Sequence, residues 1–313
     1  MTNPPNMPIS RNNAVLLACG AGLAAAVLLM VAAPLTPLPV WLVALAAGPV
    51  AAAITIALAT ALLSILVGLP VGLVFLIGFG MPILFLSWIA LMRREQPDGG
   101  RVWTSAGVLT AAWAGFGMVA ITIGILALPG ETDGAEAQIR LAVTPMMAAA
   151  LDQAGMPAEM ADSVVSMMAA LPAIIIISWM LVHLLTGMIA QAILVRMNRA
   201  ARPTPTAASM VLPLDIAAAF AFSLAFAAIG QDEGWAYLGR NLLVVSACAF
   251  LLAGFAAAHR WTAAFKHRRW ILGGVYASAV VLQYPLLALA LIGLIDQLAQ
   301  ARQRFAGEDP SGV

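Results

Sequence analysis

The sequence predicts an all-α, polytopic bundle of transmembrane helices. Hydrophobic residues make up 63% of the 313 positions and charged residues only 9%, whereas an average soluble domain has about 45–50% apolar and about 25% charged residues. The apolar residues form long continuous runs, which differ from the alternating pattern of a membrane β-barrel. We expect about eight or nine membrane helices, including one short helix near residues 39–47.

The boundaries of these helices follow from the length of each apolar run and from the prolines and charged residues that end it. About 20 apolar residues span the hydrocarbon core of a bilayer, so the run at 39–47 is too short to cross alone. Prolines 82, 172 and 285 are expected to kink or break the runs that contain them. In chain order the runs cover about residues 14–33, 39–47, 50–67, 71–92, 103–128, 163–197, 212–229, 241–258 and 270–295.

The connecting loops alternate in charge along the chain. Loops 93–101, 196–202 and 259–269 are basic, whereas segments 129–162 and 230–240 are acidic. The positive-inside rule therefore predicts that the three basic loops are cytoplasmic. The N-terminus lies on the same side if the short helix crosses. For the C-terminal run, a break at Tyr284-Pro285 would return the tail to the cytoplasm, but we expect a single crossing.

The longest polar segment, 129–162, lies on the opposite side of the membrane from the basic loops. Its six acidic residues are accompanied by a single basic one, Arg140. Two parts of it, Pro145–Gln153 and the part that starts at Pro157, have a proline at the first turn of a helix. We therefore expect an extracytoplasmic loop with short interfacial helices.

Several short motifs resemble those of known membrane proteins. They are PLPVWLVALAAGP (37–49), GFGMP (78–82), LPLD (212–215), RNLLVVSACAFLLAGFAAAHR (240–260) and GLID (293–296) with Arg302 beyond it. In their order along the chain they resemble the YybS-like family of uncharacterised bacterial membrane proteins. That family is similar over its first six helices to the S components of energy-coupling-factor transporters, which bind small nutrients.

This resemblance implies a location in the bacterial inner (cytoplasmic) membrane and a division of the chain. Residues 1–202 would form an S-component-like six-helix membrane unit, residues 203–298 a three-helix membrane unit, and residues 299–313 a polar tail. The family has no assigned activity, so the resemblance implies a fold and no reaction.

His183 and Trp179 are the best candidates for ligand-binding residues. A polar side chain in hydrocarbon is costly and needs a partner or a function. His183 lies in the middle of the run at 163–197, and Trp179 is one helical turn earlier on the same face. Both side chains could line a cavity and contact a ligand. Alternatively, His183 hydrogen-bonds a neighbouring helix and packs against Trp179.

Other polar residues are explained more simply by local structure. We expect Asp215 to favour the N-terminus of its helix and Asn241 to cap the helix that it starts. Asp296 could pair with Arg302 or Arg304 if the tail is cytoplasmic. Cys19 and Cys248 lie inside apolar runs and are expected to be buried, and no Cys or His spacing indicates a metal site.

The sequence contains no catalytic motif, so we expect neither an enzyme nor a cofactor. HExxH, GxSxG and a phosphate-binding loop are all absent from it, and any ATP-driven transport would need other subunits. A net charge of +1 argues against nucleic-acid binding. The first hypothesis is a small-molecule-binding or transport subunit. The second is a scaffold or assembly factor that acts through helix–helix contacts. Under either hypothesis, other membrane subunits could bind the small residues of the first helix, namely Gly20, Ala21, Ala24 and Ala25.

Overall fold

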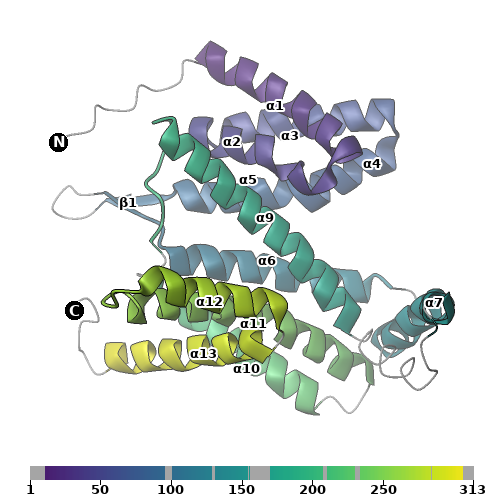
Figure 1. Ribbon diagram of the computed structural model, residues 1–313. Coiled ribbons are helices and arrows are strands. Elements are labelled where there is room, and N and C mark those ends of the chain that lie inside the picture. Colours follow the sequence, from purple (N-terminus) through teal and green to yellow (C-terminus); the bar gives the residue numbers. More distant parts are fainter. Residues whose placement is uncertain are drawn as a thin grey trace. The chain divides into compact units, whose positions relative to one another are not determined.

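The computed structural model describes residues 11–95, 101–128, 131–153, 155, 170–206, 210–229, 233–282 and 284–305. These parts are almost entirely helical (Figure 1). Seven helical segments among them are long and apolar enough to cross a membrane, and two further apolar helices, Ala33–Ala47 and Leu214–Ala228, are shorter. The prediction of an all-α polytopic membrane fold is confirmed.

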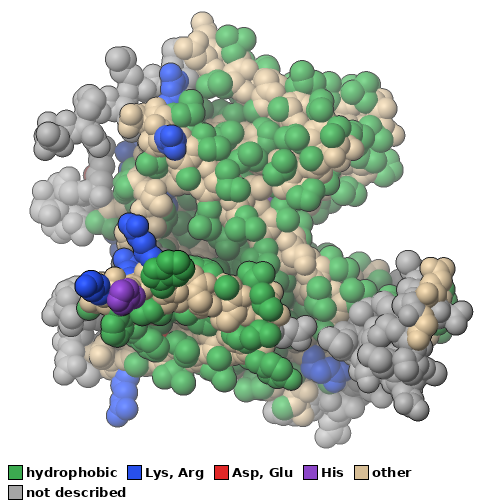
Figure 2. All heavy atoms as spheres, in the orientation of Figure 1, with side chains coloured by type: hydrophobic (Ala, Val, Ile, Leu, Met, Phe, Trp, Pro, Cys, Tyr) green, Lys and Arg blue, Asp and Glu red, His purple; other side chains and the backbone are tan. Residues whose placement is uncertain are grey.

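Hydrophobic side chains cover most of the described surface in view, and Lys and Arg side chains occur at helix ends and in connecting segments (Figure 2). Many large apolar side chains in the candidate spans are exposed, for example Leu16, Ile65, Ile123 and Met188. In water such a surface would be very unfavourable, whereas lipid tails accommodate it. The protein therefore contacts the lipid bilayer along these helices.

The chain packs as two compact units that do not follow its order. Unit 1 comprises the described residues within 1–105 and 179–206, and unit 2 those within 106–178 and 207–313. The helix α9 (Leu171–Arg196) contributes its first turns to unit 2 and the remainder to unit 1. Packing thus groups α6 (Ala106–Leu126) with the C-terminal helices. The division at residue 202 expected from the resemblance stays a prediction.

Unit 1 contains the short helix and the helices around it. The elements besides α9 are α1 (Arg11–Val31), η1 (Ala33–Leu35), α2 (Pro37–Ala47), α3 (Pro49–Leu66), α4 (Leu69–Phe75), η2 (Leu76–Gly80), α5 (Met81–Leu91), β1 (Arg93–Glu95) and β2 (Arg101–Trp103). The two strands pair in antiparallel register. Sharp turns before α3 and α4 are possible because Gly48 and Gly68 adopt φ values of +91° and +133°, which favour glycine.

Small residues bring α1 close to α3. Ala18 and Ala25 are fully buried, and a Cβ on Gly22 would lie 3.0 Å from the carbonyl oxygen of Thr55. Of the expected small-residue face of the first helix, Ala21 and Ala25 are thus used inside the unit, whereas Gly20 and Ala24 remain exposed. Cys19 is also exposed and Cys248 is half-buried, so the expectation that both thiols are buried was wrong.

Unit 2 contains α6, α7 (Glu131–Gln153), α10 (Leu214–Ile229), α11 (Glu233–Trp261), α12 (Arg268–Val281) and α13 (Tyr284–Phe305). α7 is one continuous helix that begins at Glu131 and continues through Pro145. The expectation of a short helix that starts at Pro145 was therefore wrong. The second expected helix, from Pro157, lies outside the described residues. α11 begins eight residues before the expected start, because its polar first turns carry no apolar signal.

The C-terminal run is a helical hairpin. Leu282 has extended backbone and ends α12, so the run is not one continuous helix. Whether it crosses the membrane once stays a prediction. Gly254 of α11 lies against Leu289 of α13, while Asp296, further along α13, pairs with Arg260 near the end of α11. α13 therefore runs in the same direction as α11 and returns to the end from which α12 starts (Figure 1).

Candidate functional site

His183 lies at the centre of an aromatic cluster in unit 1. Its side chain is 2% exposed. The imidazole lies 4.7 Å from the ring of Trp179 and 5.7 Å from that of Phe79, measured between centroids. Trp179 and His183 belong to α9, and Phe79 belongs to η2. The cluster thus joins the two residues predicted from the sequence to the GFGMP motif, about 100 residues earlier in the chain.

The structure explains the position of Trp179 through Pro82. The expected kink at Pro82 takes the form of a π-helical turn, η2, followed by α5. Proline has no N–H, so it cannot donate to the carbonyl of Gly78 four residues earlier. The indole Nε1–H of Trp179 donates to this carbonyl oxygen at 2.6 Å. Trp179 therefore stabilises the bulge, and single π-turns of this kind are frequent at functional sites.

The two ring nitrogens of His183 differ in their hydrogen bonding. Nδ1 lies 2.9 Å from the carbonyl oxygen of Trp179; a carbonyl can only accept, so Nδ1 carries the proton. Nε2 then presents a lone pair. It is buried without a hydrogen-bond partner among the described residues, and the nearby carbonyls of Gly78 and Phe79 cannot donate to it. Such an unsatisfied group costs about 1–3 kcal/mol.

The two interpretations of the pair therefore apply to different atoms. Packing and backbone hydrogen bonds account for Trp179 and for Nδ1 of His183. The contact with Trp179 is the one that the structural alternative expected, but the hydrogen bond of Nδ1 lies within α9 and does not reach a neighbouring helix. Packing and backbone hydrogen bonds do not account for Nε2. Ligand binding by Trp179 and His183 stays a prediction, with Nε2 as the atom on which it depends.

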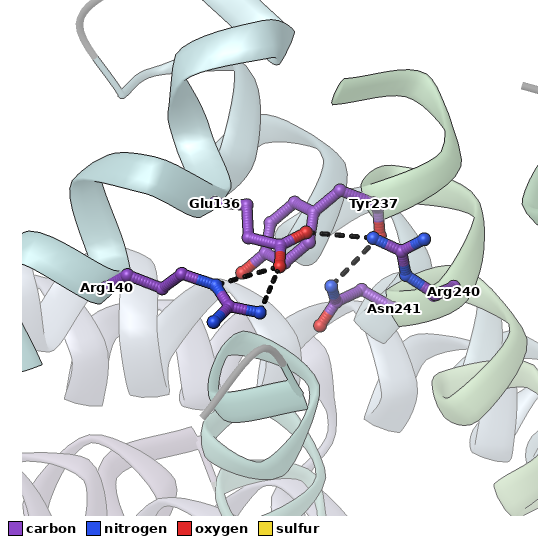
Figure 3. Close-up of polar contacts among 5 residues, drawn as sticks. All are labelled: Glu136, Arg140, Tyr237, Arg240 and Asn241. Atoms are coloured by element: carbon purple, nitrogen blue, oxygen red, sulfur yellow. Dashed lines mark hydrogen bonds and ion pairs between the residues drawn. The ribbon is translucent and has the colours of Figure 1, made fainter. Parts of the chain in front are cut away.

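A second polar cluster lies in unit 2, between α7 and α11 (Figure 3). The carboxylate of Glu136 accepts from Arg140 and Arg240, each at 2.8 Å, beside the ring of Tyr237. The side chains of Arg140 and Arg240 are 41% and 51% exposed, so these ion pairs contribute little to stability. Arg140 was noted as the single basic residue of an acidic segment, but its sequence does not indicate the distant Arg240.

Asn241 caps a helix other than its own. It lies inside α11, so the expectation that it starts this helix was wrong. Its Oδ1 accepts from the N–H of Ala173 at 3.1 Å, within the first turn of α9, where backbone donors lack helical partners. Its Nδ2 donates to the carbonyl of Tyr237 at 3.0 Å. The residue type correctly indicated a capping role, but the sequence did not show that the capped helix is α9.

Three of the sequence motifs meet where α11 ends. Arg260 and Asp296 form an ion pair at 2.5 Å, which corrects the partners predicted for Asp296; the side chain of Arg304 lies outside the described residues. The adjacent Gln297 accepts from the N–H of Leu212 at 2.7 Å. The motifs LPLD, AHR and GLID are thus joined by side-chain contacts, and they hold α10, α11 and α13 together.

Arg202, which belongs to the basic loop 196–202, is buried. It is 5% exposed and donates to the carbonyls of Ala90 at 2.6 Å and Thr104 at 3.1 Å. Ala90 is in the last turn of α5, where carbonyls lack helical donors and a cation is favourable. Burial lowers the pKa of Arg202, but arginine stays charged in proteins, so its role is to bind these carbonyls.

The part of the chain that the structure describes contains no cluster of potential metal ligands. No group of three His, Cys, Asp or Glu side chains gathers there in a way that could hold an ion.

The composition, the exposed apolar helices and their lengths define a polytopic α-helical membrane protein. Residues 14–297 match the family model described as "Predicted membrane protein (DUF2232)". The match covers most of the chain, which therefore belongs to this family. Comparisons with curated proteins and with solved structures gave no match.

Proposed function

We propose that the protein is a small-molecule-binding subunit of a membrane transport system, similar to the S components of energy-coupling-factor transporters. The observation that carries the proposal is the buried, unpaired Nε2 of His183 between two aromatic rings. A lone pair kept dry in a membrane helix is costly, and each buried unpaired group needs an explanation, of which a bound ligand is one. Aromatic walls with few polar groups are typical of small-molecule sites.

The role proposed is binding and not catalysis. Histidine could act as a base, but no nucleophile or second titratable group lies beside His183 in the contacts described for the aromatic cluster, and acid–base chemistry needs a positioned reacting group. Energy for transport would come from other subunits.

The proposed location is the bacterial inner membrane, with loops 93–101, 196–202 and 259–269 in the cytoplasm. The support is the positive charge of these loops and the positive-inside rule. α7, with its Glu136, then lies on the outer side.

Native mass spectrometry tests the binding proposal. The protein is purified from its own membrane in mild detergent, next to His183→Ala and the matched control His267→Ala, whose side chain is exposed in unit 2. We expect a reproducible small-molecule mass in the wild type and in the control, and its loss in His183→Ala. A wild-type protein that carries only bilayer lipids contradicts the proposal.

A second candidate function is that of a membrane scaffold. One observation favours it: Gly20 and Ala24 form an exposed face of α1, and no atom lies within 4 Å of a Cβ placed on Gly20. Small residues at a spacing of four allow close approach of another helix. If other membrane proteins co-purify with the wild type and are lost in Gly20→Leu, while no small molecule is found, the scaffold replaces the binding subunit.

A further inference from the structure

A second buried polar atom without a hydrogen-bond partner among the described residues lies against the face of α9 that carries His183. It is the indole Nε1–H of Trp41, in α2. Trp41 is 6% exposed. A Cβ on Gly187 would lie 3.2 Å from Cε2 of Trp41, the ring carbon bonded to Nε1. The absence of a side chain at Gly187 therefore makes room for this indole.

Gly187, against which the ring of Trp41 packs, is close to His183 along α9. Gly187 follows His183 by four residues, which is about one helical turn or ~6 Å along the axis. Residues at this spacing share a face of the helix. Trp41 Nε1–H and His183 Nε2 therefore belong to one region of unit 1, between α2, η2 and α9.

Their hydrogen-bonding roles are complementary. Trp41 Nε1–H can only donate, and His183 Nε2 can only accept while Nδ1–H donates to the carbonyl of Trp179. A single group that accepts one hydrogen bond and donates another would satisfy both. Among neutral groups, a hydroxyl does this with one atom. Each atom otherwise costs about 1–3 kcal/mol when buried unpaired.

The surroundings of this pair do not favour a charged ligand. The neighbouring groups are the rings of Phe79 and Trp179, the carbonyls of Gly78 and Phe79 and the bare backbone of Gly187. One turn further along α9 lies the neutral amide of Gln191, whose Oε1 is also buried without a hydrogen-bond partner among the described residues. None offers a counter-charge, and an ion without one is expensive in hydrocarbon. Aromatic faces instead suit an apolar body.

We propose that the site binds an uncharged, largely apolar molecule through a hydroxyl group that accepts from Trp41 Nε1–H and donates to His183 Nε2. This inference rests on the proposed function, since it names the ligand class of the same site. Trp41 becomes a specificity-determining residue, and the short helix α2 becomes part of the site.

The test compares variants that each remove one hydrogen bond and leave the packing nearly unchanged. Trp41→Phe deletes the donor and keeps an aromatic ring. His183→Asn keeps an amide donor near the position of Nδ1 and deletes Nε2. Trp88→Phe is the matched control, because Trp88 is 52% exposed on α5 of the same unit. All three are purified from their own membrane, and monodisperse elution confirms that each is folded.

We expect native mass spectrometry and analysis of the extract to find a hydroxyl-bearing molecule in the wild type and in Trp88→Phe. Its occupancy should fall about tenfold in each of the other two variants, as expected for one lost hydrogen bond in a dry site. Acetylation of the extracted molecule should prevent it from rebinding. Equal occupancy in Trp41→Phe, or a retained molecule without a hydroxyl, overturns the inference and leaves the binding function standing.

A wild-type protein without any retained molecule overturns both proposals together. The alternative to a ligand hydroxyl is a water molecule between Trp41 and His183, and resonance Raman spectroscopy of the Trp41 indole distinguishes the two cases. If the empty wild-type protein shows a hydrogen-bonded Trp41 N–H, as judged by difference from Trp41→Phe, the hydroxyl belongs to water and the inference is wrong.

Discussion

Arg202, a buried arginine that binds the end of α5, shows how much the role of a residue depends on the fold. Arg202 donates to carbonyls of α5 and of the segment before α6, and its own carbonyl accepts from Gln191 of α9 at 2.9 Å. It thus links three parts of unit 1. Its planar guanidinium supplies donors in fixed directions, which an ammonium group does not reproduce.

We therefore expect Arg202→Lys to destabilise the protein by about 2 kcal/mol, because hydrogen bonds from a charged donor to buried carbonyls are lost. The measurement is thermal unfolding in detergent, followed by the amount of monodisperse protein. The control is Arg199→Lys, since Arg199 is exposed in the same loop. If the two variants unfold at the same temperature, the carbonyl contacts of Arg202 do not contribute to stability.

At the scale of whole helices, the ends of apolar runs were predicted well where local sequence decides them. The expected helix at 50–67 is α3, and the short helix expected at 39–47 is α2, because proline and glycine mark both ends. The polar beginning of α11 was missed, since its first turns carry Glu233 and Arg240 and resemble a loop.

Contacts between distant residues could not be predicted from one sequence. The sequence indicated that His183 needs a partner, but not that Phe79 stacks on it or that Trp41 packs against Gly187, one turn further along α9. Asp296 likewise had several basic residues within reach along the chain, and only the close packing of α11 and α13 selects Arg260. The chemistry of a side chain limits the kinds of contact that it can make, and the fold determines which residue it contacts.

Two glycines allow the backbones of α11 and α13 to touch. A Cβ on Gly254 would collide with the carbonyl oxygen of Leu289, and one on Gly293 with that of Phe250. We expect Gly254→Val to force the helices apart and to cost about 3 kcal/mol, with loss of the Arg260–Asp296 pair as a consequence.

Gly273→Val provides the control for this change, because no atom lies within 4 Å of a Cβ at Gly273 in the exposed part of α12. Proteolysis in detergent measures the effect, since separation of α13 should expose the chain near Leu282. Equal resistance of both variants would show that close contact between α11 and α13 is not required.

At the scale of the whole molecule, the C-terminal hairpin decides the number of membrane crossings. α12 has 14 residues, a length of about 21 Å, which is short of the ~30 Å hydrocarbon core. From Tyr284 to Asp296, which pairs with Arg260, α13 covers about 18 Å. We therefore expect the hairpin to enter the membrane from the side of loop 259–269 and to return to that side, although Tyr284–Gln303 is long enough to span by itself.

We therefore expect residue 303 to lie in the cytoplasm together with the three basic loops. Single cysteines at Gln303, Arg94 and Ala137, in a Cys19→Ser, Cys248→Ala background, are treated in intact spheroplasts with a thiol reagent that does not cross membranes. Ala137 is exposed on α7 and should react, whereas Arg94→Cys and Gln303→Cys should react only after the membrane is opened. A single crossing makes the opposite prediction for Gln303→Cys alone, so labelling of this variant from outside, with Arg94→Cys still protected, would show that α12 and α13 together cross the bilayer once.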